Sequence, residues 1–319
     1  MYKVIMVPTD GSGSEEAAIA LAVRLAQRFE AELRLVRVDT PQLVIEPITS
    51  AAGFAQTQLA ITEARLTRLR KLEALGAQCR ALGEICVITA LEDGPVSIVL
   101  KEYAERFHVD LIVMTSHLRG GVARMTLGSV TDFLARHTDI PVLVVKNRNL
   151  MISSGDNFNR IVVPLDGSAL AEELLPHLAA LASYLNATVS LIQVLVPSGY
   201  AQKEMLEPAM PWWENEIAQS NEYLNAAADY LREAGATVST EVILSDAVAD
   251  AILDYVTRSR ADLIAITTTG AGGLGRMIFG SVADEITRKA TASVLVLHPS
   301  SRIAGTEKMR VTRQHTTAS

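Results

Sequence analysis

Short apolar runs alternate with longer segments of helical periodicity along most of the chain. The first run, Val4–Val7, is wholly apolar, and the Ala/Leu-rich segment Glu15–Phe29 repeats its apolar residues at helical spacing. The first segment predicts a buried strand and the second a helix. Because near-continuous Val/Ile/Leu runs are typical of strands covered on both faces, the alternation predicts parallel sheets flanked by helices.

Five strands are predicted in each half of the chain. In the first half they cover Val4–Val7, Leu33–Val38, Glu84–Thr89, Leu111–Thr115 and Val142–Val145. In the second half they cover Ile161–Val163, Val189–Val194, Thr240–Leu244, Leu263–Thr268 and Val294–Leu297. A long helix before each third strand is expected to end near Gly76 or Gly235. The pattern predicts two tandem α/β domains, each a doubly wound, Rossmann-like sheet of five mainly parallel strands.

The two halves repeat one another in sequence. The segment Val7–Ser12 recurs as Val163–Ser168, and the glycines and Gly-Ser-Val triplet of Gly120–Val130 recur in Gly272–Val282. Similarity in the same order over about 140 residues predicts a tandem duplication. The expected parts are a first domain at 1–147, a linker at 148–159, a second domain at 160–299 and a flexible tail at 300–319.

Composition narrows the class of protein. The 319 residues include 29 Lys and Arg against 36 Asp and Glu, without a long basic run, so neither nucleic acid nor a membrane is an expected partner. The chain starts without a secretory-type segment and its apolar runs are too short to span a bilayer, which predicts a cytoplasmic protein. Cys79 and Cys86 lack metal-type spacing and are expected to be buried, reduced thiols.

Candidate chemistry follows strands one and four, where open parallel sheets bind ligands. Asp10 and Asp166 follow the first strands, and glycine-rich loops at 115–121 and 267–273 follow the fourth strands and lead to a Gly-Ser-Val helix start. Glycines permit close backbone approach, and helix N-terminal amides favour an anion such as phosphate. An aspartate at this position accepts hydrogen bonds from ribose or amine groups.

A plainer interpretation of the loop after strand one is turn and helix-cap chemistry. In the first copy Ser12 and Glu15 have the spacing of a capping box, and Gly11 allows a sharp turn. The loop occurs twice, each time in register with the glycine-rich loop. That double occurrence favours a ligand site.

These residues resemble those of the universal stress protein family, across both copies and nearly the whole chain apart from the tail. Nucleotide-binding members of that family carry a G-x2-G-x9-G-[S/T] pattern after strand four. In the second copy the pattern falls on Thr267, Gly270, Gly280 and Ser281, with only the first glycine replaced. In the first copy Thr115 and Leu118 replace both early glycines before Gly128-Ser129.

The resemblance implies an α/β fold, ATP or AMP as ligand, assembly through the last strand, and a set of binding residues. It leaves open a magnesium ion beside the nucleotide. In the second domain the implied binding residues are Asp166, Val194, Thr267, Gly270, Gly280, Ser281 and Val282. In the first domain they are Asp10, Val38, Gly128, Ser129 and Val130.

The two copies are expected to differ in affinity for nucleotide. Leu118 occupies the position of Gly270, where the family pattern brings the backbone close to the phosphates. A leucine there adds a bulky side chain and, if the position needs positive φ, costs roughly 1–2 kcal/mol of backbone strain. Arg119 offers a partial compensation by pairing with phosphate. The sequence therefore predicts tighter binding in the second domain.

Enzyme sites find little support in the sequence. Gly270–Gly275 spells G-x-G-x-x-G, but the dinucleotide fingerprint belongs after the first strand, and a Walker A lysine motif is absent from both copies. The six histidines share neither a helical face nor a metal-type spacing, although His117 lies in the first glycine-rich loop. No catalytic residue and no metal ligand is assigned.

The resulting interpretation is a stress-related regulatory or protective protein that binds an adenine nucleotide without fast catalysis. The main alternative is a nucleotide-free scaffold of the same fold, and a slow ATPase or adenylyl-transferring enzyme comes third. The domains are expected to pair through Val142–Val145 and Val294–Leu297, with a homodimer also open. The divergent segments after strand two, about 39–62 and 197–215, are expected to be lids or partner surfaces.

Overall fold

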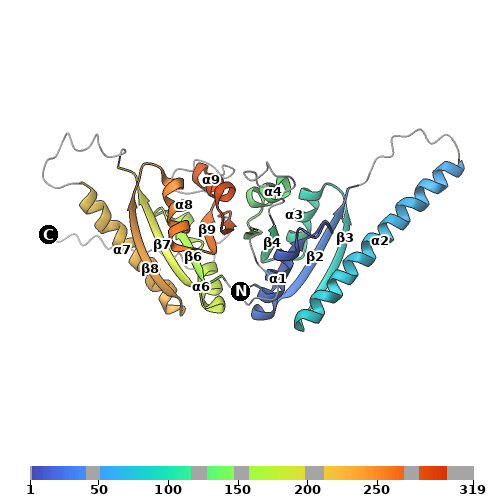
Figure 1. Cartoon of the computed structure of the whole chain (residues 1–319), viewed down its shortest axis with the longest axis horizontal. Coiled ribbons are helices and arrows are strands. Elements are labelled where there is room, and N and C mark those ends of the chain that lie inside the picture. The colour runs from blue at the N-terminus through green and yellow to red at the C-terminus, as the bar shows by residue number, and fades with distance from the viewer. Residues whose placement is uncertain are drawn as a thin grey trace.

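The computed structural model describes residues 2–40, 51–115, 128–146, 158–197, 212–268 and 280–299, in which strands and helices alternate (Figure 1). The first half contains β1 (Val4–Pro8), α1 (Glu16–Phe29), β2 (Glu32–Asp39), α2 (Ala51–Gly83), β3 (Val87–Asp93), α3 (Val96–Arg106), β4 (Leu111–Thr115), α4 (Ser129–His137) and β5 (Val142–Val145).

The second half repeats this order, with the first helix divided in two. It contains β6 (Arg160–Pro164), α5 (Ala169–Glu172), α6 (Leu175–Leu185), β7 (Thr188–Leu195), α7 (Trp212–Glu233), β8 (Thr237–Leu244), α8 (Val248–Ser259), β9 (Leu263–Thr267), α9 (Ser281–Lys289) and β10 (Ser293–Leu297). The division falls just before Pro176, which lacks a backbone N–H and commonly stands in the first turn of a helix.

Among the described residues the strands form one sheet in the order β3-β2-β1-β4-β5-β10-β9-β6-β7-β8. Within each half the neighbouring strands are parallel, and the winding reverses between β1 and β4 and between β6 and β9. The prediction of two tandem, doubly wound α/β layers is confirmed. Each reversal is a topological switch point, where side helices part and leave room for a ligand.

The two halves meet through their last strands. β5 and β10 pair antiparallel, with Val294 opposite Val144 and Val296 opposite Val142, so the expected contact between these strands is confirmed. Figure 1 shows α4 and α9 facing each other on either side of this seam, with α2 and α7 at the two outer ends. Pairing the two strands satisfies backbone groups that a single domain would leave exposed.

Three apolar clusters fill the two faces of the sheet. The largest draws residues from β1, α1, β6 and α6, so on that face the two halves share one core. The other face has two smaller clusters, one beneath α3 and α4 and one beneath α8 and α9. Burial on both faces explains why β4 and β9 are apolar up to a final threonine.

The end of α2 was predicted wrongly. The helix continues past Gly76 to Gly83, and β3 starts at Val87 instead of Glu84. Gly76 is buried inside the helix against Thr89 of β3, where a Cβ would come within 2.7 Å of the threonine methyl. The glycine therefore serves close helix–sheet packing. Glu84 has φ of 39° and turns the chain between the two elements.

The capping box predicted at Ser12 and Glu15 is also absent. Helix α1 begins at Glu16, and Ser12 Oγ lies 2.8 Å from Ser14 Oγ instead of capping the helix. The Glu15 carboxylate turns back to accept hydrogen bonds from Thr9 Oγ1 and from the backbone N–H of Gly11 at 3.0 Å. In the second copy Ser168 does cap its helix, accepting from the N–H of Ala171.

One further expectation needs correction, that of two buried cysteines. Cys79 is buried as predicted but belongs to α2, whereas Cys86 is exposed. Of the segments expected to be lids or partner surfaces, 51–62 belong to α2 and 212–215 to α7, while 41–50 and 198–211 lie outside the described residues. No helix within the described ranges is both long and apolar enough to cross a bilayer.

Candidate functional site

The strand register brings the predicted residues of the second domain to one level of the sheet. Pro164 is opposite Ile192, and Val162 is opposite Ile264. Two residues beyond the first pair, Asp166 is level with Val194. Four residues beyond the second pair, Asp166 is level with the end of β9. The three positions therefore meet at the carboxyl edge, across the switch point between β6 and β9.

The loop after β6 is held by its own side chains. Asp166 Oδ1 accepts hydrogen bonds from the Ser168 N–H at 3.0 Å and from Ser168 Oγ at 2.6 Å. Gly167 between them has φ of 79°, a conformation in which a side chain is strained. The plainer interpretation of this motif as turn and cap chemistry is thus confirmed for the loop itself, and the same loop fixes the carboxylate at the sheet edge.

The loop after β1 shares the hydrogen bond between the aspartate and the serine N–H and adds a buried acid. Asp10 Oδ1 accepts from the Ser12 N–H at 2.8 Å, and Gly11 has φ of 72°. Glu15, only 4% exposed, occupies the space beneath this loop. In the second copy the corresponding residue is Ala171, so the first loop is packed around a carboxylate and the second around a methyl group.

The helix after the second glycine-rich loop starts directly at the end of β9. The N–H of Gly280 donates to the Thr268 carbonyl at 2.7 Å, and a Cβ on Gly280 would lie 3.3 Å from that oxygen. Gly280 has φ of −59°, so close approach, and not an unusual backbone angle, favours glycine here. As N-cap it provides no side-chain acceptor for the first amides of α9, which include those of Ser281 and Val282.

The first domain repeats this arrangement. Gly128 is the N-cap of α4 with φ of −59° and no side-chain cap hydrogen bond, and Ser129 and Val130 open the helix. Helix N-terminal amides favour an anion, because the helix dipole adds to their partial positive charge. In both domains the N-cap residue itself makes no side-chain hydrogen bond to these amides.

Apolar contacts place the strand-two valines on the same face as these helices. Val194 and Val282 are both half-buried against the cluster beneath α8 and α9. Val38 and Val130 are half-buried against the cluster beneath α3 and α4. In each domain an apolar side chain at the sheet edge thus shares its face with the helix N-terminus, which is the combination that a ligand with a flat apolar ring and a phosphate would use.

Charged residues follow closely behind the helix N-termini. Asp284 lies in the first turn of α9 and forms ion pairs with Arg288 of the same helix at 2.6 Å and with Arg136 of α4 at 3.2 Å. Its negative charge would otherwise oppose an anion at that helix end. The pairing with Arg136 also links the two candidate sites across the seam.

The sequence did not reveal the importance of His298 and Lys146, which directly follow the last strands of the two halves. His298 Nδ1 lies 2.7 Å from Thr268 Oγ1, behind the start of α9. Lys146, at the same place in the first copy, reaches across the seam and donates from Nζ to the Thr287 carbonyl at 2.8 Å, and burial lowers its pKa. A lysine directly after an apolar last strand was the available signal.

On the opposite face of the second domain, Tyr223 of α7 lies behind the Asp166 loop. Burial raises the pKa of Tyr223, and the neighbouring carboxylates of Glu172 and Asp166 raise it further. Burial also raises the pKa of Glu172. These groups support the loop from behind and do not face the helix N-terminus.

Part of the predicted site falls outside the described residues. Gly270, Leu118, Arg119 and His117 belong to that part of the chain. Thr267 is half-buried as the last residue of β9, and Thr115 is buried as the last residue of β4. The described structure thus contains the Asp, Val, Thr and Gly-Ser-Val elements of the pattern, without the early loop position that distinguishes the two copies.

Two observations concern other kinds of site. Within the described ranges no group of three or more His, Cys, Asp or Glu side chains is arranged to hold a metal ion. A cavity of about 790 Å³ lies at the opposite, amino-terminal edge of the first sheet, next to Lys3, Glu32 and Cys86. It is remote from the switch points and contains none of the predicted site residues.

The fold and these edges define a tandem, doubly wound α/β protein with two topological switch points, one in each half. The chain belongs to the universal stress protein family: the sequence model of that family matches residues 1–146 and again residues 157–298. The resemblance inferred from the sequence is therefore confirmed.

Similar proteins include one that matches nearly the whole chain and one that matches about half of it. The chain is 24% identical over 303 residues to a universal stress protein of Mycolicibacterium smegmatis, covering 92% of this chain and 97% of that protein. It is 32% identical over 154 residues to a universal stress protein of Methanocaldococcus jannaschii, covering 47% of this chain and 88% of that protein. The crystal structure of a universal stress protein from Archaeoglobus fulgidus superposes with a TM-score of 0.60 at 17% identity, covering 93% of this chain and 98% of the other, and supports the fold.

Proposed function

We propose that this protein binds an adenine nucleotide, ATP or AMP, in the second domain, and acts in the cytoplasm as a stress-related regulatory or protective binder. The proposed contacts are the Asp166 carboxylate with the ribose, Val194 with the adenine ring, and the amides of Gly280–Val282 with the phosphates. Gly270 and Thr267 would line the loop between them. Magnesium would accompany the phosphates of ATP, held by the phosphates themselves.

One observation carries this proposal. An aspartate, an apolar strand residue and a helix N-terminus without a side-chain cap meet at one switch point, with Val194 and Val282 against the same apolar cluster. A nucleotide needs these three kinds of contact, because its ribose, base and phosphates differ in polarity. The glycine pattern resembles that of nucleotide-binding members of the family and supports the same conclusion.

The first domain has the same elements, Asp10, Val38, Gly128, Ser129 and Val130, but a leucine at position 118. We propose that it binds nucleotide more weakly, by about one order of magnitude if the leucine adds 1–2 kcal/mol of strain. Loss of direct phosphate contact would weaken it further. The asymmetry predicts one strongly occupied site per chain.

The test begins with the purified full chain. Any nucleotide carried through purification is released by heat and identified by mass spectrometry, and the stoichiometry and affinity for ATP and AMP are then measured by titration calorimetry. Gly270→Leu should remove most binding, and the matched change Leu118→Gly should strengthen or create the first site. Absence of binding in the unmodified chain, or equal affinity with and without Gly270→Leu, would overturn the proposal.

A scaffold of the same fold is the competing function. It is favoured by the replacement of the early pattern glycines with Thr115, Leu118 and Thr267. In that case no adenine nucleotide would bind in calorimetry, and partner association would not respond to ATP. Slow hydrolysis or adenylyl transfer would instead show as product formation at saturating ATP. The sequence offers no Ser-His-Asp or paired-carboxylate arrangement, and binding without fast turnover is the expected result.

A further inference from the structure

Helix α2 projects beyond the sheet that supports it. Arg68 Nη1 lies 3.1 Å from the carboxylate of Asp39, the last residue of β2, and Arg65 pairs with Asp93, the last residue of β3. The helix starts at Ala51, so its turns before Arg65 extend past the ends of both strands, as Figure 1 shows.

The projecting turns of α2 lack the packing against the sheet that stabilises the rest of the helix. Isolated helical segments shorter than about 12–15 residues are marginal in water, and helices in proteins are stabilised mainly by packing of an apolar face. The sheet-supported half of α2 meets this condition through Leu72, 3% exposed, and Cys79, 1% exposed. Neither the described β2 nor the described β3 reaches the projecting half.

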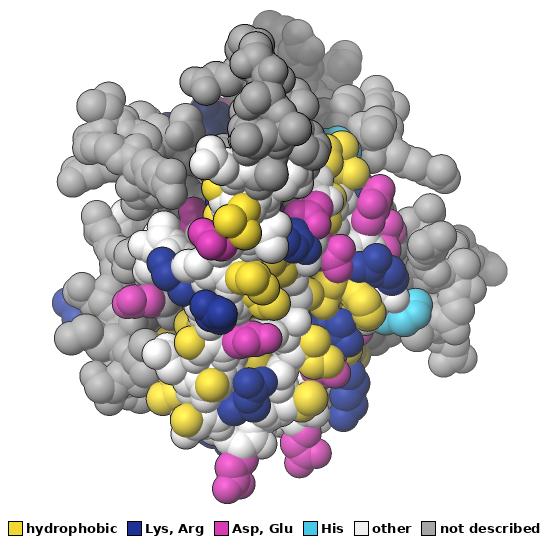
Figure 2. Space-filling model, turned by 90° about the vertical axis from the view of Figure 1, so that its right-hand side faces the viewer, with side chains coloured by type: hydrophobic (Ala, Val, Ile, Leu, Met, Phe, Trp, Pro, Cys, Tyr) yellow, Lys and Arg dark blue, Asp and Glu magenta, His cyan; other side chains and the backbone are white. Residues whose placement is uncertain are grey.

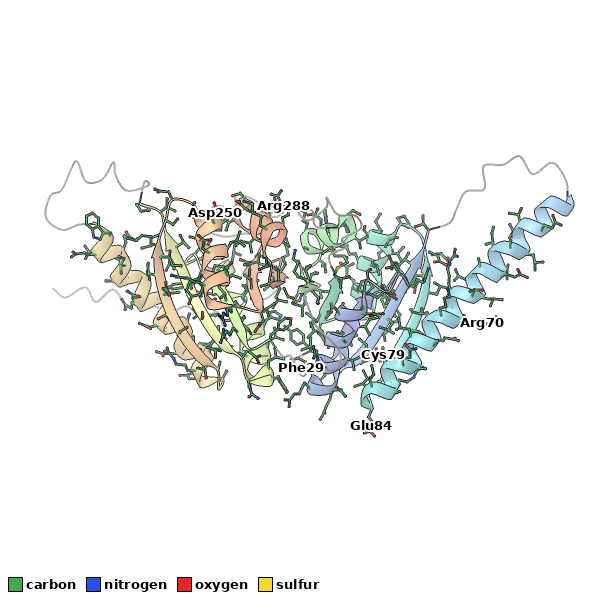
Figure 3. All side chains as sticks on the ribbon, viewed as in Figure 1. Phe29, Arg70, Cys79, Glu84, Asp250 and Arg288 are labelled. Atoms are coloured by element: carbon green, nitrogen blue, oxygen red, sulfur yellow. The ribbon has the colours of Figure 1, made fainter. Side chains whose placement is uncertain are left out.

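The opposite, outward face of α2 carries its own pattern. Leu59, Glu63, Leu66 and Arg70 follow one another at spacings of four, three and four residues, which aligns them on one side of a helix. Leu59 is 60% exposed and Leu66 46% exposed. Figure 3 shows Arg70 on the side of α2 turned away from the sheet.

Charges on this face are self-complementary. Within the described residues, neither the Glu63 nor the Arg70 side chain has an ion-pair partner, although many other Arg side chains are paired. Figure 2 views this end of the molecule and shows hydrophobic side chains interspersed with charges of both signs. Glu63 and Arg70 flank Leu66 on either side along the helix.

We propose that the outward face of α2 binds the same face of a second copy of this chain, antiparallel, to form a homodimer. A two-fold axis near Leu66 places Glu63 of each copy opposite Arg70 of the other and brings the two Leu66 side chains together. Leu59 then packs over the small Ala74 of the second copy. The projecting turns of each helix lie along the sheet-supported turns of the other, which covers the outward side of both.

The corresponding helix of the second half lacks these features. Arg80 donates to the Val87 carbonyl at 2.8 Å and Arg232 to the Val238 carbonyl at 3.1 Å, which aligns α2 with α7. In this alignment α7 begins nine residues later than α2. Glu63, Leu66 and Arg70 correspond to Asn215, Ala218 and Glu222. The dimer surface therefore belongs to the first half alone.

The experiment compares masses of the full chain by light scattering and sedimentation equilibrium over a wide concentration range. The unmodified chain should rise from 34.4 kDa toward twice that mass. Glu63→Arg and Arg70→Glu each turn two attractions into two repulsions and should each weaken the dimer about tenfold or more. An equimolar mixture of the two variants should associate again, because each supplies the charges that the other lacks.

The matched control is Glu222→Arg, the same charge change on α7, which should leave the dimer unchanged. Recovery in the mixture separates loss of contact from loss of folding. A chain that stays at 34.4 kDa at every concentration overturns the proposal. So does a dimer that both single variants leave intact, or a mixture that fails to associate.

Discussion

Tyr2 and His177 join the two halves of the protein through a contact of 3.0 Å between Tyr2 Oη and His177 Nδ1. Their rings stack with centroids 5.9 Å apart, and Phe29 packs edge-on against Tyr2 at 5.1 Å. Tyr184 lies 4.4 Å from Phe29 by the same measure. This aromatic cluster sits between α1 and α6, where Figure 3 labels Phe29, and is part of the core that the halves share.

The cluster predicts a loss of stability in acid. Burial lowers the pKa of His177 to about 4, against the partial opposing effect of Asp110. Because the folded-state pKa lies below the unfolded value of 6.5, the contribution is complete above about pH 6.5 and is lost as pH falls through about 4. The difference amounts to about 3 kcal/mol. Urea denaturation across this range should show it.

The variant His177→Gln should flatten that part of the pH profile, since glutamine does not titrate. His137→Gln provides the control, because His137 is an exposed residue of α4 and its replacement should leave the profile unchanged. An acid loss that persists in His177→Gln would assign the effect to other groups.

Separated halves should find each other in solution. Residues 1–147 and 160–299, expressed apart, expose the edges of β5 and β10 and one side of the shared core. We expect a one-to-one complex in sedimentation experiments, and homodimers when either half is alone. Two halves that stay monomeric together at high concentration would contradict the view that these edges drive pairing.

Removal of Lys146 should weaken the contact between the halves. Lys146→Ala deletes the ammonium that donates to Thr287 in α9 and leaves that carbonyl without this partner. A charged hydrogen bond of this kind contributes about 1–2 kcal/mol. Thermal unfolding should report a lower midpoint, whereas Lys101→Ala, which removes an exposed pair within α3, should have little effect. Equal shifts for the two variants would exclude a special role for Lys146.

Gly167 provides a test of the loop that holds Asp166. With φ of 79°, Gly167→Ala should cost roughly 1–2 kcal/mol of stability, although a Cβ there has room, 3.7 Å from Gln193 Nε2. Gly167→Asn should cost less, because asparagine tolerates the left-handed region. Calorimetric unfolding of both variants measures the difference. Equal destabilisation would point to crowding instead of backbone strain.

The elements that the sequence predicts well are those that local pattern determines. β4 and β9 are buried on both faces, and their sequences are apolar up to a final threonine. The Asp and Gly-Ser-Val positions were predictable because topology alone brings the carboxyl ends of adjacent parallel strands together. The strand register alone sets how far along the sheet these positions lie, so no long-range side-chain contact had to be predicted.

The errors arise where tertiary packing overrides local preference. Gly76 signals a helix end by itself, but its contact with Thr89 makes it a packing position. Glu15 has the spacing of a cap but is drawn under the Asp10 loop by Thr9 and Gly11. The Tyr2–His177 contact joins residues 175 positions apart, which no local pattern reveals.

The antiparallel seam between β5 and β10 also fixes the ratio of the two halves in each molecule. Because both strands belong to one chain, every molecule brings together one copy of each half at a high effective concentration, whatever the cellular level of the protein. Neither half has to recognise itself through that edge. Sequence differences such as Leu118 against Gly270 can then persist in a fixed ratio, because every molecule contains one of each.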